Sequence, residues 1–330
     1  TCAFFTAFTG ASGVTIVAVG ALLLPALVQA GYPEKFSLGL VTTSGSLGLL
    51  LAPSLPLIIY GVIVQQMDLP VPFTIQELFI AGTLPALLMI VLLTGYSIWV
   101  TRGAPIVRGS YTRADALAAV KASRWEIPMP ILVLGGIYSG YFAVSEAAAV
   151  TAFYVLLVEV VIHGEVKVKS LPKIIRESMI MVGGILLILG VSLAFTNFLI
   201  DSEVPQALFA WIQTFVSDKL TFLILLNIVL LVLGAILDIF SALVIMIPLI
   251  VPMAIGFGVD PVHLGIIFLA NMQIGYFTPP IGMNLFIASY RFKRSITELY
   301  RATLPFMAVL IIALLIITYV PAVSLVFLDR

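Results

Sequence analysis

Long apolar runs alternate with short polar segments along the whole chain. A helix needs about 20 apolar residues to cross a bilayer. Segments of about that length predict membrane spans at 37–64, 78–100, 128–142, 145–161, 179–200, 262–289 and 303–327. Two shorter apolar segments, 13–28 and 242–256, follow polar tips. We expect these two to be arms of re-entrant helical hairpins.

One arrangement of apolar and polar positions occurs twice, in 10–60 and in 234–290. Each copy has a Gly-rich polar tip, an apolar helix, a short turn and an apolar helix broken by small polar residues and proline. A shift of 226 residues places Leu38-Gly39-Leu40 on Leu264-Gly265-Ile266 and the first break on the second. Interrupted hydrophobic segments at matching positions of two halves indicate the binding site of a secondary transporter.

Composition excludes a soluble globular domain. Hydrophobic residues make up 62% of the chain and charged residues 10%, with a mean hydropathy of +1.20. Soluble domains carry about 25% charged residues. The prediction is therefore an all-α, polytopic membrane protein. The 16 basic and 16 acidic residues balance, so charge indicates no nucleic-acid partner. The single cysteine, Cys2, forms no disulfide within the chain.

Basic residues predict how the chain crosses the membrane. Lys and Arg prefer cytoplasmic loops. They gather in three loops, 101–126, 167–176 and 291–301, and are absent from 65–77 and 201–218. The helices fit between these loops only if the first hairpin opens to the cytoplasm and the second to the opposite side. The two copies are therefore predicted to be inverted repeats, the plan of many transporters.

This plan divides the chain into three parts. Residues 1–100 form the first half, 101–178 form cytoplasmic loops and a central helix pair, and 179–330 form the second half. The first copy has a shorter arm before its tip than the second, so we expect N-terminal helices to be missing. A short amphipathic surface helix is predicted after Thr112, because Thr112 and Asp115 have the spacing of a capping box.

The polar breaks are the candidates for ion binding. Non-helical backbone is tolerated inside a bilayer only where it is buried or lines a cavity. Residues 9–15 break the first hairpin and 42–48 break the helix that follows. Their carbonyls and hydroxyls are hard oxygen ligands that suit sodium. The second cluster consists of Gly234, Asp238, Asn271, Gly275, Thr278, Pro279 and Pro280. Proline donates no hydrogen bond, which leaves nearby carbonyls unpaired.

The same region is predicted to hold an anion. The helices after the two tips direct positive partial charge toward it. With no Lys or Arg predicted nearby, hydroxyls, backbone N–H groups and bound cations would hold the substrate, or else the missing N-terminal part would. The candidate substrate-binding residues are Ser12, Thr15, Ser46, Asp238 and Asn271. Glycine and serine also serve helix packing, and Asp238 can equally cap the helix that follows it. Capping is the favoured role of Glu146.

Several motifs resemble the large membrane subunit (DctM or SiaM type) of tripartite ATP-independent periplasmic (TRAP) transporters. The resemblance covers 9–321, nearly the whole chain. It is carried by Gly10-Ala11-Ser12-Gly13-Val14-Thr15, Thr43-Ser44-Gly45-Ser46-Leu47-Gly48, Ser145-Glu146-Ala147-Ala148-Ala149-Val150 and Gly275-Tyr276-Phe277-Thr278-Pro279-Pro280-Ile281-Gly282. The chain departs from the family at Gly13, where Val is commoner, and at Ile239-Phe240.

The resemblance implies an elevator-type importer of small organic acids, coupled to Na⁺, in the cytoplasmic membrane of a bacterium or archaeon. It implies one sodium at Ser12 with Ser44, Gly45 and Gly48, and a second at Gly234, Gly275, Thr278 and the carbonyl of Ile281. It also implies two protein partners. These are a small four-helix membrane subunit of the DctQ or SiaQ type and a periplasmic substrate-binding protein of the DctP or SiaP type.

Two other functions remain open at this point. One is a divalent-anion/sodium symporter that works without a binding protein, although its Ser-Asn-Thr hairpin motif is absent here. The other is an intramembrane enzyme, which would need a nucleophile with a base or paired acids with a metal. No predicted midplane cluster provides either. Sialic acid, C4-dicarboxylates and similar carboxylates all fit a site without a diagnostic charge.

Overall fold

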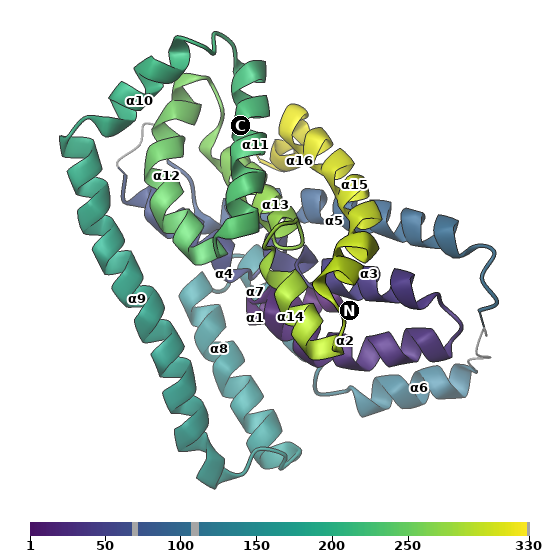
Figure 1. The fold of residues 1–330 in the computed structure, drawn as a ribbon. Helices are drawn as coiled ribbons and strands as arrows, with labels where there is room; N and C mark the ends of the chain where they lie inside the picture. Colours follow the sequence, from purple (N-terminus) through teal and green to yellow (C-terminus); the bar gives the residue numbers. More distant parts are fainter. Residues whose placement is uncertain (68–71, 107–111, 329–330) are drawn as a thin grey trace. The chain divides into compact units, whose positions relative to one another are not determined.

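Helices account for all the regular secondary structure of the residues described by the computed structural model, which are 1–67, 72–106 and 112–328 (Figure 1). Within these described residues, eight helical segments are long and apolar enough to cross a membrane. The all-α, polytopic membrane fold is thereby confirmed. Arg108, a basic residue of the first predicted cytoplasmic loop, lies outside the described residues.

The chain forms two compact units. One comprises Thr1–Val107 with Val191–Arg330, and the other comprises Arg108–Gly190. Both copies of the repeat belong to the first unit. The division at residues 100 and 178 that the sequence suggested remains a prediction.

The first copy begins with a helical hairpin and continues into a broken helix. Gly10 ends the first arm with a φ of 66°, a conformation that glycine adopts without steric cost. The break lies between Ser44 and Leu55, where only a short 3₁₀ turn forms. The elements are α1 (Cys2–Thr9), α2 (Ser12–Gln29), α3 (Glu34–Ser44), η1 (Leu47–Leu50), α4 (Leu55–Gln65) and α5 (Ile75–Thr101).

The second copy repeats this order. Asp218 and Asp260 cap the helices that start the hairpin and the broken helix, each accepting backbone N–H groups of the first turn. The elements are α10 (Val204–Gln213), α11 (Lys219–Ile236), α12 (Ile239–Gly256), α13 (Pro261–Gly275), α14 (Met283–Phe292), α15 (Ile296–Tyr319) and α16 (Ala322–Leu325). Sequence analysis predicted a loop at 201–218 and missed α10, which packs against α12.

Reciprocal packing relates the two copies. The first residues of α2, α3 and α4 precede those of α12, α13 and α14 by 227, 227 and 228 residues, close to the predicted shift. Helix α2 packs against α14 while α12 packs against α4, and α3 packs against α15 while α13 packs against α5. A two-fold relation between two copies produces such exchanged pairs. The inverted repeats, the two hairpins and the two broken helices are therefore confirmed.

The second unit contains the predicted surface helix. The hydroxyl of Thr112 accepts a hydrogen bond from the Asp115 N–H at 3.2 Å, and Asp115 accepts one from the Thr112 N–H at 2.9 Å. The bonds from Thr112 lower the pKa of the Asp115 carboxyl. Glu146 accepts from the Ala143 N–H, which confirms its capping role. The elements are α6 (Arg113–Ala122), α7 (Pro128–Tyr138), α8 (Val144–Leu156), η2 (Leu157–Ile162), η3 (Val168–Ser170) and the part of α9 (Leu171–Asp201) up to Gly190. The predicted span at 128–142 is the short α7, 11 residues long.

Membrane orientation is expected to follow the basic loops. In a Cys2→Ser background, a cysteine at the exposed Ser123 should react with an impermeant thiol reagent only from the cytoplasmic side. A cysteine at the exposed Ser202 should react only from the periplasmic side, because its loop has no basic residues. The measurement is labelling in intact cells and in inverted vesicles. Labelling of both positions from one face would contradict the predicted topology.

Candidate functional site

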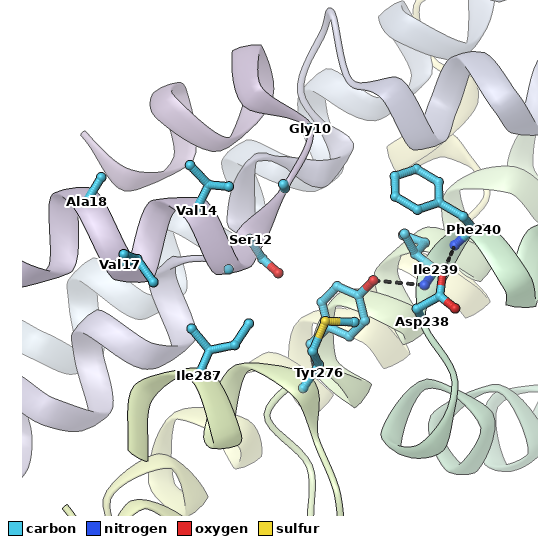
Figure 2. A pocket seen from close by; sticks show the side chains of 13 residues that line it. Gly10, Ser12, Val14, Val17, Ala18, Asp238, Ile239, Phe240, Tyr276 and Ile287 are labelled. Carbon is cyan, nitrogen blue, oxygen red and sulfur yellow. Dashed lines mark hydrogen bonds between the residues drawn. The ribbon is translucent and has the colours of Figure 1, made fainter. Parts of the chain in front are cut away.

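The tips of both hairpins line one cavity of about 470 Å³ (Figure 2). The first turns of α2 and α12 lie on its two sides, and Tyr276 from the second break and Ile287 from α14 lie between them. A single cavity thus collects residues from both repeats. Binding sites of transporters built on inverted repeats lie at such repeat interfaces.

The first hairpin presents an uncapped helix N-terminus to the cavity. Ala11 precedes α2 and has no side-chain acceptor, so the N-cap residue does not cap this helix. Unpaired N–H groups of a first turn carry partial positive charge and favour an anion. The Ser12 hydroxyl, at the start of the same turn, points toward the space between the two tips in Figure 2. The first tip can therefore hold an anionic group.

The second hairpin differs because its own carboxylate occupies the helix start. Asp238 accepts hydrogen bonds from the N–H groups of Phe240 at 2.9 Å and Ser241 at 3.1 Å, and from the Ser241 hydroxyl. The Ile239 N–H donates to the Tyr276 hydroxyl at 2.8 Å. Asp238 therefore caps α12. Because it also lines the cavity, its role in substrate binding stays a prediction.

A hydrogen bond between the repeats anchors the first tip. The Ser12 hydroxyl donates to Oδ1 of Asn284 in α14 at 2.8 Å, and both residues are buried. The Asn284 N–H in turn donates to the Tyr276 carbonyl at 2.9 Å, within the second break. Sequence analysis missed Asn284. A polar residue that opens an apolar helix after tandem prolines was the signal that could have found it.

The first break holds a buried cluster of oxygens. The Thr6 hydroxyl donates to the Gly45 carbonyl at 2.7 Å and lies 2.6 Å from the Thr15 hydroxyl. The Ser46 hydroxyl donates to the Gln273 carbonyl in α13 at 3.0 Å. The structure therefore joins Thr15 and Gly45 through Thr6, which sequence analysis did not single out. Ser44 is bonded within its own helix, to the Val41 carbonyl at 3.4 Å.

Glycines let each break approach a hairpin arm. A Cβ on Gly48 would lie 2.1 Å from the Ala3 carbonyl oxygen of α1. A Cβ on Gly275 would lie 2.4 Å from the Gly234 carbonyl carbon of α11. The two close contacts are equivalent, because each joins a break to the first arm of its own hairpin. In both copies the glycine of the break thereby lies directly against the backbone of the arm.

The remaining predicted residues of the second sodium site lie around the tandem prolines. The Thr278 hydroxyl donates to the Ile274 carbonyl at 2.8 Å, which leaves its lone pairs available to a cation. The N–H of Gly282, next to the exposed Ile281, donates to the Ala235 carbonyl at 2.9 Å. These contacts fit an oxygen-only site.

Asn271 lies apart from the cavity. Its amide donates to Oδ1 of Asn227 in α11 at 2.7 Å and to the Ile267 carbonyl at 2.8 Å. Asn227 is also bonded to Thr318 of α15. Of the five predicted substrate-binding residues, Ser12 and Asp238 line the cavity. Thr15 and Ser46 lie at the first break, and Asn271 lies in a network that joins three helices.

The donor set of the site suits hard monovalent cations. Within the described residues, no group of three or more His, Cys, Asp or Glu side chains could hold a metal ion. Hydroxyls and backbone carbonyls are the groups gathered at both breaks. Oxygen ligands without several carboxylates fit sodium better than a divalent metal. The sodium sites remain predictions.

Comparison with known proteins gives consistent matches. The family model described as "Tripartite ATP-independent periplasmic transporter, DctM component" matches residues 1–323. The C4-dicarboxylate TRAP transporter large permease protein DctM of Pseudomonas aeruginosa is 34% identical over 98% of this chain and 74% of its own length. The sialic acid TRAP transporter large permease protein SiaM of Vibrio cholerae is 31% identical over 96% of this chain and 74% of its own length.

Two further matches concern a longer protein and a solved structure. The isethionate TRAP transporter permease protein DctMQ of Oleidesulfovibrio alaskensis is 35% identical over 99% of this chain, which spans 51% of that protein. The crystal structure of the Alcanivorax borkumensis YdaH transporter, described as having an unusual topology, superposes with a TM-score of 0.64 at 16% identity, over 96% of this chain and 77% of that one. The second match is evidence for the fold alone.

Proposed function

The chain belongs to the DctM component of the tripartite ATP-independent periplasmic transporters, and from this premise we propose that it is the transport subunit of a system importing a small organic acid. The relatives are permeases, which confirms the prediction of a transport protein rather than an enzyme. Family membership and the eight candidate spans make it a multi-pass protein of the bacterial cytoplasmic membrane.

The observation that carries the proposal is the cavity between the two hairpin tips. It lies where the repeats meet, and the uncapped start of α2 gives it one end suited to a carboxylate. Ser12 lies at this end, held by Asn284. A carboxylate bound there would be held by the N–H groups of the first turn of α2, because the Ser12 hydroxyl donates its one hydrogen to Asn284.

Sodium coupling is the second part of the proposal. The first break brings oxygens together at Thr6, Thr15 and Gly45, and the second break, which includes the cavity residue Tyr276, presents the Thr278 hydroxyl. A cation bound at either break would lower the cost of bringing an anion into a region without Lys or Arg. Substrate and sodium would then strengthen each other's binding reciprocally. In this proposal the hairpins and the broken helices move together as the mobile part of an elevator mechanism.

Two protein partners complete the proposed system. A small four-helix membrane subunit of the DctQ or SiaQ type would join this chain in the membrane. A periplasmic binding protein of the DctP or SiaP type would deliver the acid. The rival proposal is a symporter that works without the binding protein, and the transport assay separates the two.

The test is uptake by the full-length transporter with its small subunit in proteoliposomes. The probes are labelled succinate, sialic acid and 4-methylpentanoate, each with and without the binding protein, and protein-free liposomes correct for passive entry. Uptake of at least one acid is expected to fall roughly tenfold or more when potassium replaces sodium, because the coupling ion then contributes no driving force. Uptake that needs no sodium would contradict the coupling. Uptake that needs no binding protein would favour the rival symporter.

A further inference from the structure

The walls of the cavity between the hairpin tips are apolar except at a few positions. Val14, Val17 and Ala18 of α2 line one side, and Ile287 of α14 lies below them in Figure 2. Met283 of α14 also lines the cavity. Ile239 and Phe240 of α12 line the opposite side, with the Phe240 ring directed toward the cavity. An apolar body of a ligand therefore has surface to pack against on each side.

The polar groups of the lining already have partners. The Asp238 carboxylate accepts three hydrogen bonds from its own helix, and the Tyr276 hydroxyl accepts the Ile239 N–H. The Ser12 hydroxyl donates to Asn284, and the uncapped start of α2 lies at the same tip. None of the described residues that line the cavity is Lys or Arg. These residues offer one end for a negative charge and no side-chain donor for a second.

We propose that the substrate is a monocarboxylate with an apolar body, rather than a dicarboxylate or a polyhydroxylated acid. The inference rests on the proposed function, which supplies the organic acid, and it adds the class of acid. The carboxylate lies at the N–H groups of the first turn of α2, beside the bonded Ser12. The apolar body lies between Val17, Phe240 and Ile287.

A second carboxylate is disfavoured for two physical reasons. It would lose its hydration among apolar side chains with no donor to replace the water. It would also share the cavity with the Asp238 carboxylate, which is of like charge. A hydroxyl group on the ligand would also lose its hydration in this cavity, at a smaller cost in free energy, because a buried hydroxyl needs a hydrogen-bond partner.

The test compares two acids of equal shape. In 4-methylpentanoate an isopropyl group takes the place of one carboxylate of succinate, so the two molecules differ in charge and polarity at one end only. Binding to the full-length transporter with its small subunit is measured by titration in sodium buffer, following thermal stabilisation. The dissociation constant of 4-methylpentanoate is expected to be roughly tenfold or more below that of succinate.

Two variants test where the apolar body of the ligand lies, and a third controls for partition of the ligand into detergent. Phe240→Ala keeps the backbone N–H that bonds to Asp238 and removes one apolar wall, so 4-methylpentanoate should bind roughly tenfold more weakly. Ile287→Thr is the second test at the opposite wall and should act in the same direction. Phe286→Ala is the control, since Phe286 is exposed on α14 and does not line the cavity.

The outcomes separate this inference from the proposed function. Succinate binding as tightly as 4-methylpentanoate, or equal affinities in Phe240→Ala and Phe286→Ala, would overturn the inference and leave an organic-acid transporter in place. Failure of succinate, sialic acid and 4-methylpentanoate alike to bind or to be taken up would instead contradict the proposed function.

Discussion

Replacing Gly275 by alanine is expected to reduce transport roughly a hundredfold. The added Cβ would lie 2.4 Å from the carbonyl carbon and 2.5 Å from the Cα of Gly234, closer than van der Waals contact allows. Both atoms belong to the backbone, so no side chain can rotate away. Overpacking costs about 1–3 kcal/mol and more where the backbone must move. About 3 kcal/mol corresponds to a factor above a hundred.

We expect transport to be affected because Gly234 and Gly275 hold the second hairpin against the second break. Sodium-driven uptake and the melting temperature of the purified transporter are the measurements, and both should fall. Gly95→Ala is the matched control, since nothing lies within 4 Å of a Cβ built there. Gly48→Ala, which would place a Cβ 2.1 Å from the Ala3 carbonyl oxygen, should behave like Gly275→Ala. Normal uptake by Gly275→Ala would show that the tip and the break tolerate separation.

Thr278→Val is expected to raise the sodium concentration for half-maximal transport between about tenfold and a hundredfold. Valine keeps the shape of threonine and removes one oxygen. Losing one ligand of a charged group costs about 1.5–3 kcal/mol. Substrate affinity should weaken with it, because coupling between two ligands is reciprocal.

The control for this substitution is Thr303→Val in α15. Thr278 and Thr303 make the same contact, a hydroxyl donating to the carbonyl four residues earlier, at 2.8 and 3.0 Å. The general cost of removing such a bond is therefore matched between the two variants. An equal sodium requirement in both, with normal expression, would make Thr278 a packing residue and place the sodium elsewhere.

Local patterns account for what the sequence predicted correctly. Apolar runs of spanning length, a repeated order of tip, arm and broken helix, and the distribution of Lys and Arg depend only on residues near one another in the chain. They were sufficient for the helical membrane fold and for two inverted copies. The caps at Thr112 and Glu146 were also predictable, since a cap involves residues three positions apart.

The tertiary structure decided which polar residues meet. Asn271 and Asp238 looked alike as polar positions in the second copy, yet Asn271 bonds to Asn227 of α11 and Asp238 faces the cavity. Thr6 and Asn284 acquire their places through contacts with Gly45 and Ser12, across 39 and 272 residues. The sequence by itself therefore determined the elements and their repetition. Because side chains distant in the chain become neighbours only when helices pack, the composition of the cavity was decided by the fold.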